Sequence, residues 1–208
     1  MKTLAVISQK GGVGKTTIAT ALAVAAERDG KSVALFDLDP QVSACSWADR
    51  RKGAGHGETP VVRDVNFNRL PHALDAMRQA GCDLVILDCP PVHRDIAHEA
   101  MNAADLILIP TRAEAFDLRA MTQTVKLAQQ IGKTPSVVLT FCPPTGAEIE
   151  QAHAMSMAEF TRQPYFTPIT LEDFRATYES AKRGVDPRYV FTAWSPEGEF
   201  AGYVFGVR

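Results

Sequence analysis

Short apolar runs recur along the first two thirds of the chain, and each is followed by glycine-rich or polar residues. The runs cover residues 4–7, 32–36, 84–87, 104–111 and 136–141, with a weaker one at 61–65. The run at 32–36 is continuously apolar after its first residue, which is typical of a parallel strand that is buried on both faces. The pattern therefore predicts a mostly parallel sheet.

The segments between these runs have the composition of helices. Residues 17–28 are rich in alanine, residues 43–51 and 71–80 are predicted to be helical, and residues 117–131 carry apolar positions on one side. Gly30, Gly81 and Gly132 follow three of these segments, where a helix commonly ends. Strands that alternate with helices predict an α/β fold, a doubly wound sheet with helices on both faces.

The last quarter of the chain departs from this alternation. Prolines interrupt residues 163–168, a helix is predicted over 171–182, and two aromatic strands, 189–194 and 200–205, flank a turn at 195–199. The second pattern is typical of a β-hairpin. We therefore expect a domain at 1–155 and an atypical segment at 156–208. Whether that segment packs on the same domain stays open.

Composition narrows the class of protein only a little. The 208 residues suit one domain, or one domain with a small appendage, and 46% hydrophobic residues suffice for a core. A net charge of −2 indicates neither a nucleic acid nor an acidic membrane as partner. The four cysteines show no metal-binding spacing, and no apolar run is long enough to span a membrane. We expect free thiols and a cytoplasmic location.

A glycine-rich stretch between the first strand and the first helix carries the strongest chemical signal. It covers residues 8–17 and reads Ser-Gln-Lys-Gly-Gly-Val-Gly-Lys-Thr-Thr. Glycines let backbone N–H groups turn inward around an anion, and the following helix N-terminus adds to the attraction. Lys15 is placed to reach the β- and γ-phosphates, and the Thr16 hydroxyl to bind Mg²⁺. The predicted nucleotide-binding residues are Lys10, Gly11, Gly12, Val13, Gly14, Lys15, Thr16 and Thr17.

Acidic residues follow two of the other predicted strands. Asp37 and Asp39 come after the second strand, and Asp88 ends the strand at 84–87. Ligands of such sheets bind outside the carboxyl ends of the strands, so these carboxylates are expected near the phosphates. Asp88 is suited to hold a water of the Mg²⁺ shell opposite Thr16. The predicted metal-binding residues are Thr16, Asp37 and Asp88.

Three of these motifs together resemble the ParA/MinD family of deviant Walker-type ATPases, and the short plasmid-partition branch in particular. The run Lys-Gly-Gly-Val-Gly-Lys-Thr-Thr has the family's extra lysine, Lys10, and the Asp-x-Asp-Pro-Gln and Asp-x-Pro-Pro runs match its two switches. The resemblance implies that Lys10 crosses a dimer interface to the partner's nucleotide. It also implies that Asp39 orients the attacking water and that Asp37 lies near the Mg²⁺ shell. Lys10, Lys15 and Asp39 are then the catalytic residues.

The resemblance implies an ATPase that binds ATP and Mg²⁺, dimerises on ATP, and hydrolyses it slowly without a partner. A ParB-like centromere-binding adaptor and non-specific DNA would be its partners, and its task would be the segregation of DNA or another cargo. A membrane-positioning ATPase of the MinD kind is an alternative, but it needs a basic amphipathic C-terminal helix. Because residues 199–208 read as a strand, no membrane contact is expected.

A further alternative is a nucleotide-binding module that has lost DNA binding. From residue 159 on, six basic residues face seven acidic ones, whereas the family usually places DNA contacts near this end. The resemblance stops near residue 155, and the segment beyond resembles the first half of a GNAT acetyltransferase. It lacks the strand and loop that would hold acetyl-CoA, so no acetyl transfer is expected.

Some residues are candidates only through their position. By resemblance, Arg112, Glu114 and Phe116 are candidates for the dimer interface, and the loop at 142–146 for contact with adenine. His93 and Arg94 follow the second switch and are interpreted as solvated residues of that loop, because a lone histidine is weak evidence for catalysis.

Overall fold

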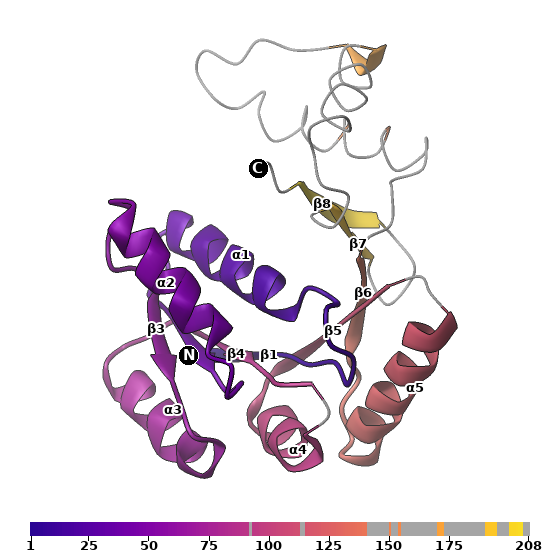
Figure 1. The fold of residues 1–208 in the computed structure, drawn as a ribbon, viewed down its shortest axis with the longest axis horizontal. Coiled ribbons are helices and arrows are strands. Elements are labelled where there is room, and N and C mark those ends of the chain that lie inside the picture. Colours follow the sequence, from indigo (N-terminus) through magenta and orange to yellow (C-terminus); the bar gives the residue numbers. More distant parts are fainter. Residues whose placement is uncertain are drawn as a thin grey trace. The chain divides into compact units, whose positions relative to one another are not determined.

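The structure is a computed structural model of the 208-residue chain (Figure 1). It describes residues 1–91, 93–112, 115–140, 190–194 and 200–205, together with positions 150, 154 and 170–172. Two compact units divide the chain, Met1–Ser136 and Val137–Arg208. The predicted boundary at residue 155 lies outside the described residues and stays a prediction.

The first unit is built on five parallel strands. These are β1 (Lys2–Val6), β2 (Val33–Asp37), β3 (Val61–Asp64), β4 (Leu84–Asp88) and β5 (Leu106–Arg112). Their order in the sheet is β3-β2-β4-β1-β5, so β1 lies between the two strands that come latest in this unit. The chain thus winds outward from β1 in both directions, which makes the carboxyl end of β1 a topological switch point.

Helices cover both faces of this sheet (Figure 1). The helices α1 (Lys15–Arg28) and α2 (Ser43–Gly53) lie on one face. On the other face lie α3 (Leu70–Gln79), α4 (Arg94–Ala103) and α5 (Ala115–Gln130), with a short 3₁₀ turn, η1 (Phe67–Arg69), before α3. The predicted doubly wound α/β fold is confirmed.

The core lies between the sheet and these helices. On the side of α1, the fully buried Leu35 and Ile86 from the strands pack against Ala19 and Ala23 from the helix. Alanine on the inner face lets the helix approach closely, and the branched strand residues fill the space. Burial of one leucine- or isoleucine-sized side chain contributes about 2 kcal/mol, so this layer holds the loop before α1 on a rigid base.

The helix α4 is absent from the elements predicted from the sequence. His93 and Arg94 were interpreted as solvated loop residues; they are exposed, but His93 is the N-cap residue of the helix and Arg94 its first residue. The helix buries Ile96, Ala97, Ala100 and Met101 on one face. That spacing of i, i+1, i+4 and i+5 is the sequence signal for a helix. The switch motif just before it favours a loop instead.

The strand β6 (Ser136–Thr140) belongs to the second unit from Val137 on, and it pairs antiparallel with β7 (Val190–Trp194). In turn, β7 pairs antiparallel with β8 (Phe200–Phe205). The last two strands confirm the antiparallel pair of the predicted hairpin, whose turn at 195–199 lies outside the described residues. Most of the helix predicted at 171–182 lies outside the described residues. In the part of the chain that the structure describes, no helix is long and apolar enough to cross a membrane.

Candidate functional site

Strand register gathers the acidic strand ends beside the glycine loop. Asp88 is paired in register with Val6 at the end of β1 and with Asp37 at the end of β2. The loop that leaves β1 is therefore next to Asp88, although more than seventy positions separate them in the sequence. This confirms that one edge of the sheet collects the predicted motifs.

The glycine loop is shaped to receive an anion. Gly12 and Gly14 have positive φ angles of 72° and 88°, in the left-handed region that only glycine adopts at low cost. Gly14 is also the N-cap of α1, whose first intrahelical hydrogen bond runs from the Ile18 N–H to the Gly14 oxygen. The three amides before Ile18 consequently form the open, positively polarised end of the helix.

Lys15 is buried at the base of this loop. Its side-chain ammonium donates to the backbone oxygen of Lys10 over 3.0 Å. Burial lowers the pKa of Lys15, while the nearby carboxylates of Asp88 and Asp39 act in the opposite direction. A cation that burial has stripped of water is prepared to bind phosphate oxygens strongly, because no hydration shell has to be removed first.

Asp88 is a buried carboxyl whose two oxygens have no hydrogen-bond partner among the described residues. Burial raises its pKa to about 7, opposed by the Thr16 hydroxyl and the Lys15 ammonium. Buried polar groups are normally satisfied, so an orphaned carboxyl in a cluster with a hydroxyl indicates a missing ligand. A hard cation bound through oxygen fits this donor set, as does a metal-bound water. Thr16 and Asp88 are thus suited to hold Mg²⁺.

Asp37 has a different set of contacts from Asp88. One carboxylate oxygen accepts from the Asp39 N–H (3.1 Å), and the other accepts from the N–H groups of Ala44 (2.8 Å) and Cys45 (3.2 Å). The side chain therefore ties the Asp39 loop to the N-terminus of α2. Its proposed place near the metal shell stays a prediction.

The Asp39 loop ends in a strained residue. Val42 has φ 46° and ψ 42°, and it is the one residue other than glycine with positive φ in the described part of the chain. Such a conformation costs on the order of 1–3 kcal/mol for a β-branched side chain. Asp39 itself is half-buried, and one of its carboxylate oxygens accepts from the Gln41 N–H at 3.0 Å. Its predicted role in orienting water is compatible with this position, and stays a prediction.

Lys10 does not point freely into solvent. Its ammonium lies 3.7 Å from a carboxylate oxygen of Asp117, near the start of α5, and the Lys10 side chain is 44% exposed. The other oxygen of Asp117 accepts from the Arg112 guanidinium at 2.5 Å. Arg112 and Lys10 lower the pKa of Asp117. Asp117 is not among the site residues predicted from the sequence, where its position five residues after a strand-end arginine is its only signal.

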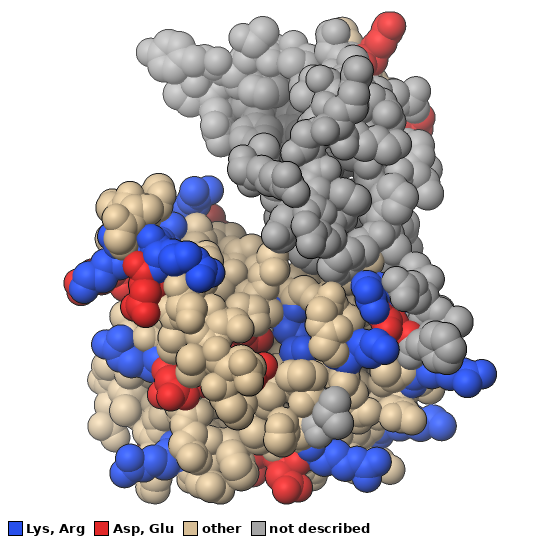
Figure 2. All heavy atoms as spheres, in the orientation of Figure 1, with Lys and Arg blue, Asp and Glu red and all other residues tan. Residues whose placement is uncertain are grey.

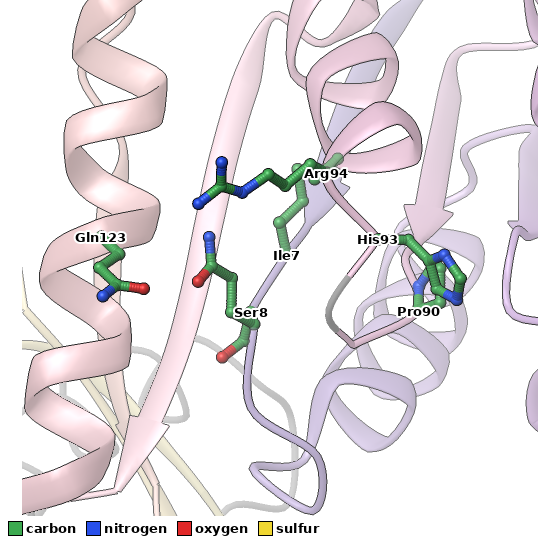
Figure 3. Close-up of a pocket in the computed structure, with 8 residues that line it drawn as sticks. Ile7, Ser8, Pro90, His93, Arg94 and Gln123 are labelled. Carbon is green, nitrogen blue, oxygen red and sulfur yellow. The ribbon is translucent and has the colours of Figure 1, made fainter.

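A cleft of about 330 Å³ opens beside the loop (Figure 3). Its lining joins the end of β1 to the turn after β4 and to helices α4 and α5. Arg94 and Gln123 point toward one another across it, while His93 lies beside Pro90 (Figure 3). The predicted interface residues Glu114 and Phe116, and the loop at 142–146, lie outside the described residues or side chains.

Comparison with known proteins agrees with this geometry. Residues 4–185 match the family described as the CobQ/CobB/MinD/ParA nucleotide binding domain. The match passes residue 155, where the resemblance seen in the sequence was expected to stop. The chain is also 31% identical over 201 residues to the chromosome-partitioning ATPase Soj of Thermus thermophilus, covering 81% of each protein.

Two further similarities differ in what they show. The chain is 35% identical over 133 residues to the maintenance of carboxysome distribution protein A of Halothiobacillus neapolitanus, which covers 64% of this chain and 60% of that protein. Cobyrinic acid a,c-diamide synthase of Mycobacterium smegmatis, solved with ADP and magnesium, superposes with a TM-score of 0.57. That comparison covers 88% of this chain and 94% of the other at 21% identity, so it shows the fold alone.

The site and the sequence comparisons lead to one assignment. A glycine loop with two left-handed glycines precedes a helix, a buried lysine lies at its base, and an orphaned carboxyl ends the neighbouring strand. These features occur together within the matched residues, 4–185. The chain belongs to the CobQ/CobB/MinD/ParA family of nucleotide-binding domains.

Proposed function

We propose that the protein is a ParA-like positioning ATPase, which dimerises on binding ATP with Mg²⁺ and hydrolyses ATP to ADP and phosphate. The observation that carries the proposal is the loop itself: the family lysine Lys10 is half-exposed at the surface, while Lys15 is buried at the base. One lysine is thus suited to its own subunit's phosphates, and the other can reach beyond the subunit.

Binding rests on the residues of the loop. The amides of residues 11–17 and the Lys15 ammonium would hold the phosphates, and Thr16 and Asp88 would hold Mg²⁺ with its water shell. When bound, Mg²⁺ supplies positive charge where negative charge builds up on the phosphates. The chain's own contribution is to place the buried Lys15 ammonium and the N-terminus of α1 beside the phosphates, while Lys10 would act on the nucleotide of the second subunit.

Hydrolysis needs a water aligned with the bond between the β- and γ-phosphates. Asp39 lies on the loop after β2, beside the strand end that carries Asp88. Its carboxylate would orient the water, and Lys10 of a second subunit would stabilise charge on the transferred phosphoryl group. The site is then complete only in the dimer, so we expect slow turnover in dilute protein and faster turnover when a partner protein stabilises the closed state.

The names of similar proteins indicate the general class of cargo. One similar protein is named for chromosome partitioning and another for carboxysome distribution, so we propose intracellular positioning of DNA or of a protein cargo, with a ParB-like adaptor as partner. The proposed location is the cytoplasm, on the nucleoid if DNA is bound.

The mixture of acidic and basic residues favours weak binding to DNA. It therefore supports a second candidate function, a nucleotide switch with impaired DNA association. On the face in Figure 2, acidic side chains lie among the basic ones over the described residues. From residue 159 on, acids outnumber bases. Duplex binding needs several cations on one surface, and its affinity falls steeply with salt.

One experiment tests both candidates. ATP hydrolysis and dimerisation are measured for the full chain with and without duplex DNA at about 150 mM salt, where charges are screened beyond about 8 Å. The ATPase proposal requires ATP-dependent dimers and turnover that rises with protein concentration, and turnover independent of concentration would contradict it. Tight ATP-dependent DNA binding at this salt concentration would exclude the second candidate.

A further inference from the structure

Asp117 is an unusual carboxylate for the start of a surface helix. It is 1% exposed, and it lies between two cations, Arg112 and Lys10. Only one of its oxygens accepts a hydrogen bond within the described residues, from Arg112; the other, 3.7 Å from the Lys10 ammonium, accepts none. A buried charge without full compensation is costly, so this oxygen attracts the ammonium of Lys10.

The backbone of Lys10 is held as well as its side chain. The Lys15 ammonium donates to the Lys10 carbonyl oxygen over 3.0 Å. The Lys10 amide in turn donates to the Ser8 hydroxyl at 3.3 Å. These contacts fix the loop so that Lys10 reaches Asp117 of its own subunit. A phosphate that drew Lys15 away would remove one of the two constraints on the residue.

We propose that Asp117 is a positioning residue that retains Lys10 in its own subunit and so sets how readily two ATP-bound subunits associate. The inference rests on the proposed function, in which Lys10 reaches the partner's nucleotide. The same ammonium cannot neutralise Asp117 and a phosphate of the partner at full strength. Association therefore includes an exchange of one anion for another around Lys10.

Because Arg112 also contacts Asp117, changing either residue should shift dimer association, in opposite directions. Arg112 already neutralises part of the Asp117 charge, and its own side chain is 27% exposed. Removing the Arg112 charge leaves the Asp117 carboxylate with Lys10 as the cation that remains of the two described beside it, which strengthens retention of Lys10. Removing the Asp117 charge weakens retention. Two substitutions in one ion-pair cluster should consequently have opposite effects on association.

The test compares Asp117→Asn with Arg112→Gln in the full chain. Dimer dissociation constants are measured by analytical ultracentrifugation with a non-hydrolysable ATP analogue and Mg²⁺. Coupling energies in the lower part of the range for residues in contact correspond to about 3- to 10-fold in affinity, and this part applies because both cations are partly exposed. We expect Asp117→Asn to tighten the dimer by about that factor and Arg112→Gln to weaken it similarly. Shifts in the same direction would show a merely structural role and overturn the proposal.

A second measurement observes Lys10 directly in the nucleotide-free chain. The rate of Lys10 acetylation by a small reagent is followed by mass spectrometry, with the exposed Lys31 as internal reference. The rate relative to Lys31 should rise in Asp117→Asn and fall in Arg112→Gln. An unchanged rate in both variants would contradict retention, even if either variant were too unstable to dimerise.

These measurements separate the inference from the function on which it rests. If the wild-type chain does not dimerise with the ATP analogue, the proposed function is wrong, and acetylation alone still decides whether Asp117 retains Lys10. If the wild-type chain dimerises and the two variants do not diverge, the function stands and the inference is wrong.

Discussion

Two lysine–aspartate pairs flank the glycine loop, and they differ in almost every electrostatic respect. Lys15 interacts with Asp88 at the base, where both residues are buried, and burial raises the pKa of Asp88 to about 7. Lys10 lies beside Asp117 near the surface, and the added Arg112 helps to hold the pKa of Asp117 below its usual value. Both aspartates are 1% exposed.

Burial alone therefore does not decide the charge of these carboxyls. Asp88 has a single lysine and a hydroxyl nearby, together with two other acids, Asp37 and Asp39. Asp117 has two cations. The inner pair is thus short of positive charge, which a metal ion would supply, whereas the outer carboxylate has two cations of its own subunit beside it. The inner pair is suited to ligand binding and the outer pair to controlled release of a lysine.

The largest expected difference between the pairs is in nucleotide affinity. Lys15→Ala should lower ADP affinity by about 1,000-fold, roughly 4 kcal/mol, because the phosphates lose their buried cation. Lys10→Ala should change it by less than about 3-fold and remove ATP-dependent dimerisation instead. Fluorescent ADP titration measures both, and equal losses of affinity would refute distinct roles for the two lysines.

Asp39 sharpens the comparison, because it influences the inner pair without belonging to it. Asp39→Ala should lower the hydrolysis rate by about 100-fold, since the water loses its orienting group. ATP binding should persist, so that an ATP dimer accumulates. Phosphate release assays and size-exclusion chromatography check the two outcomes together. Wild-type turnover in the variant would remove Asp39 from the mechanism.

The pH dependence of stability should distinguish the two aspartates. In the folded chain Asp88 binds its proton more tightly than in the unfolded chain. Its contribution to the free energy of unfolding therefore falls as pH rises from about 4 to about 7. Asp88→Asn should stabilise the nucleotide-free protein near pH 8 by on the order of 2 kcal/mol and make its stability less dependent on pH. Urea unfolding at several pH values measures this.

The Asp88→Asn variant should also lose the effect of Mg²⁺ on nucleotide affinity, whereas a retained Mg²⁺ effect would exclude Asp88 from the metal site.

The contribution of Asp117 to the free energy of unfolding should change with pH in the opposite direction to that of Asp88, and by less. The pKa of Asp117 is lower in the folded chain, so its stabilising contribution is present above the unfolded pKa and is lost as pH falls through the folded value. Asp117→Asn should destabilise the protein near pH 7 by about 1 kcal/mol, since both cations are partly exposed to solvent. A difference from wild type that grows toward acid pH, in the same unfolding experiment, would contradict this assignment.

The sequence by itself determined the strands, most of the helices and the loop at 8–17. Continuous apolar runs and glycine positions are local signals, and β1, α1, β2 and the aromatic hairpin follow them closely. The same local pattern placed Lys15 at the loop and Asp88 at a strand end. The helix α4 had a local signal too, in the spacing of Ile96, Ala97, Ala100 and Met101, but the preceding motif obscured it.

Only the tertiary structure decided how the charged residues of the site are compensated. Asp37 and Asp88 both end buried strands, yet backbone amides from α2 surround the first and leave the second without a described partner. The contact of Lys10 with Asp117 joins residues more than a hundred positions apart. Such contacts depend on strand order and helix placement, and electrostatic energies change with distances of a few ångströms. Sequence spacing does not carry that information.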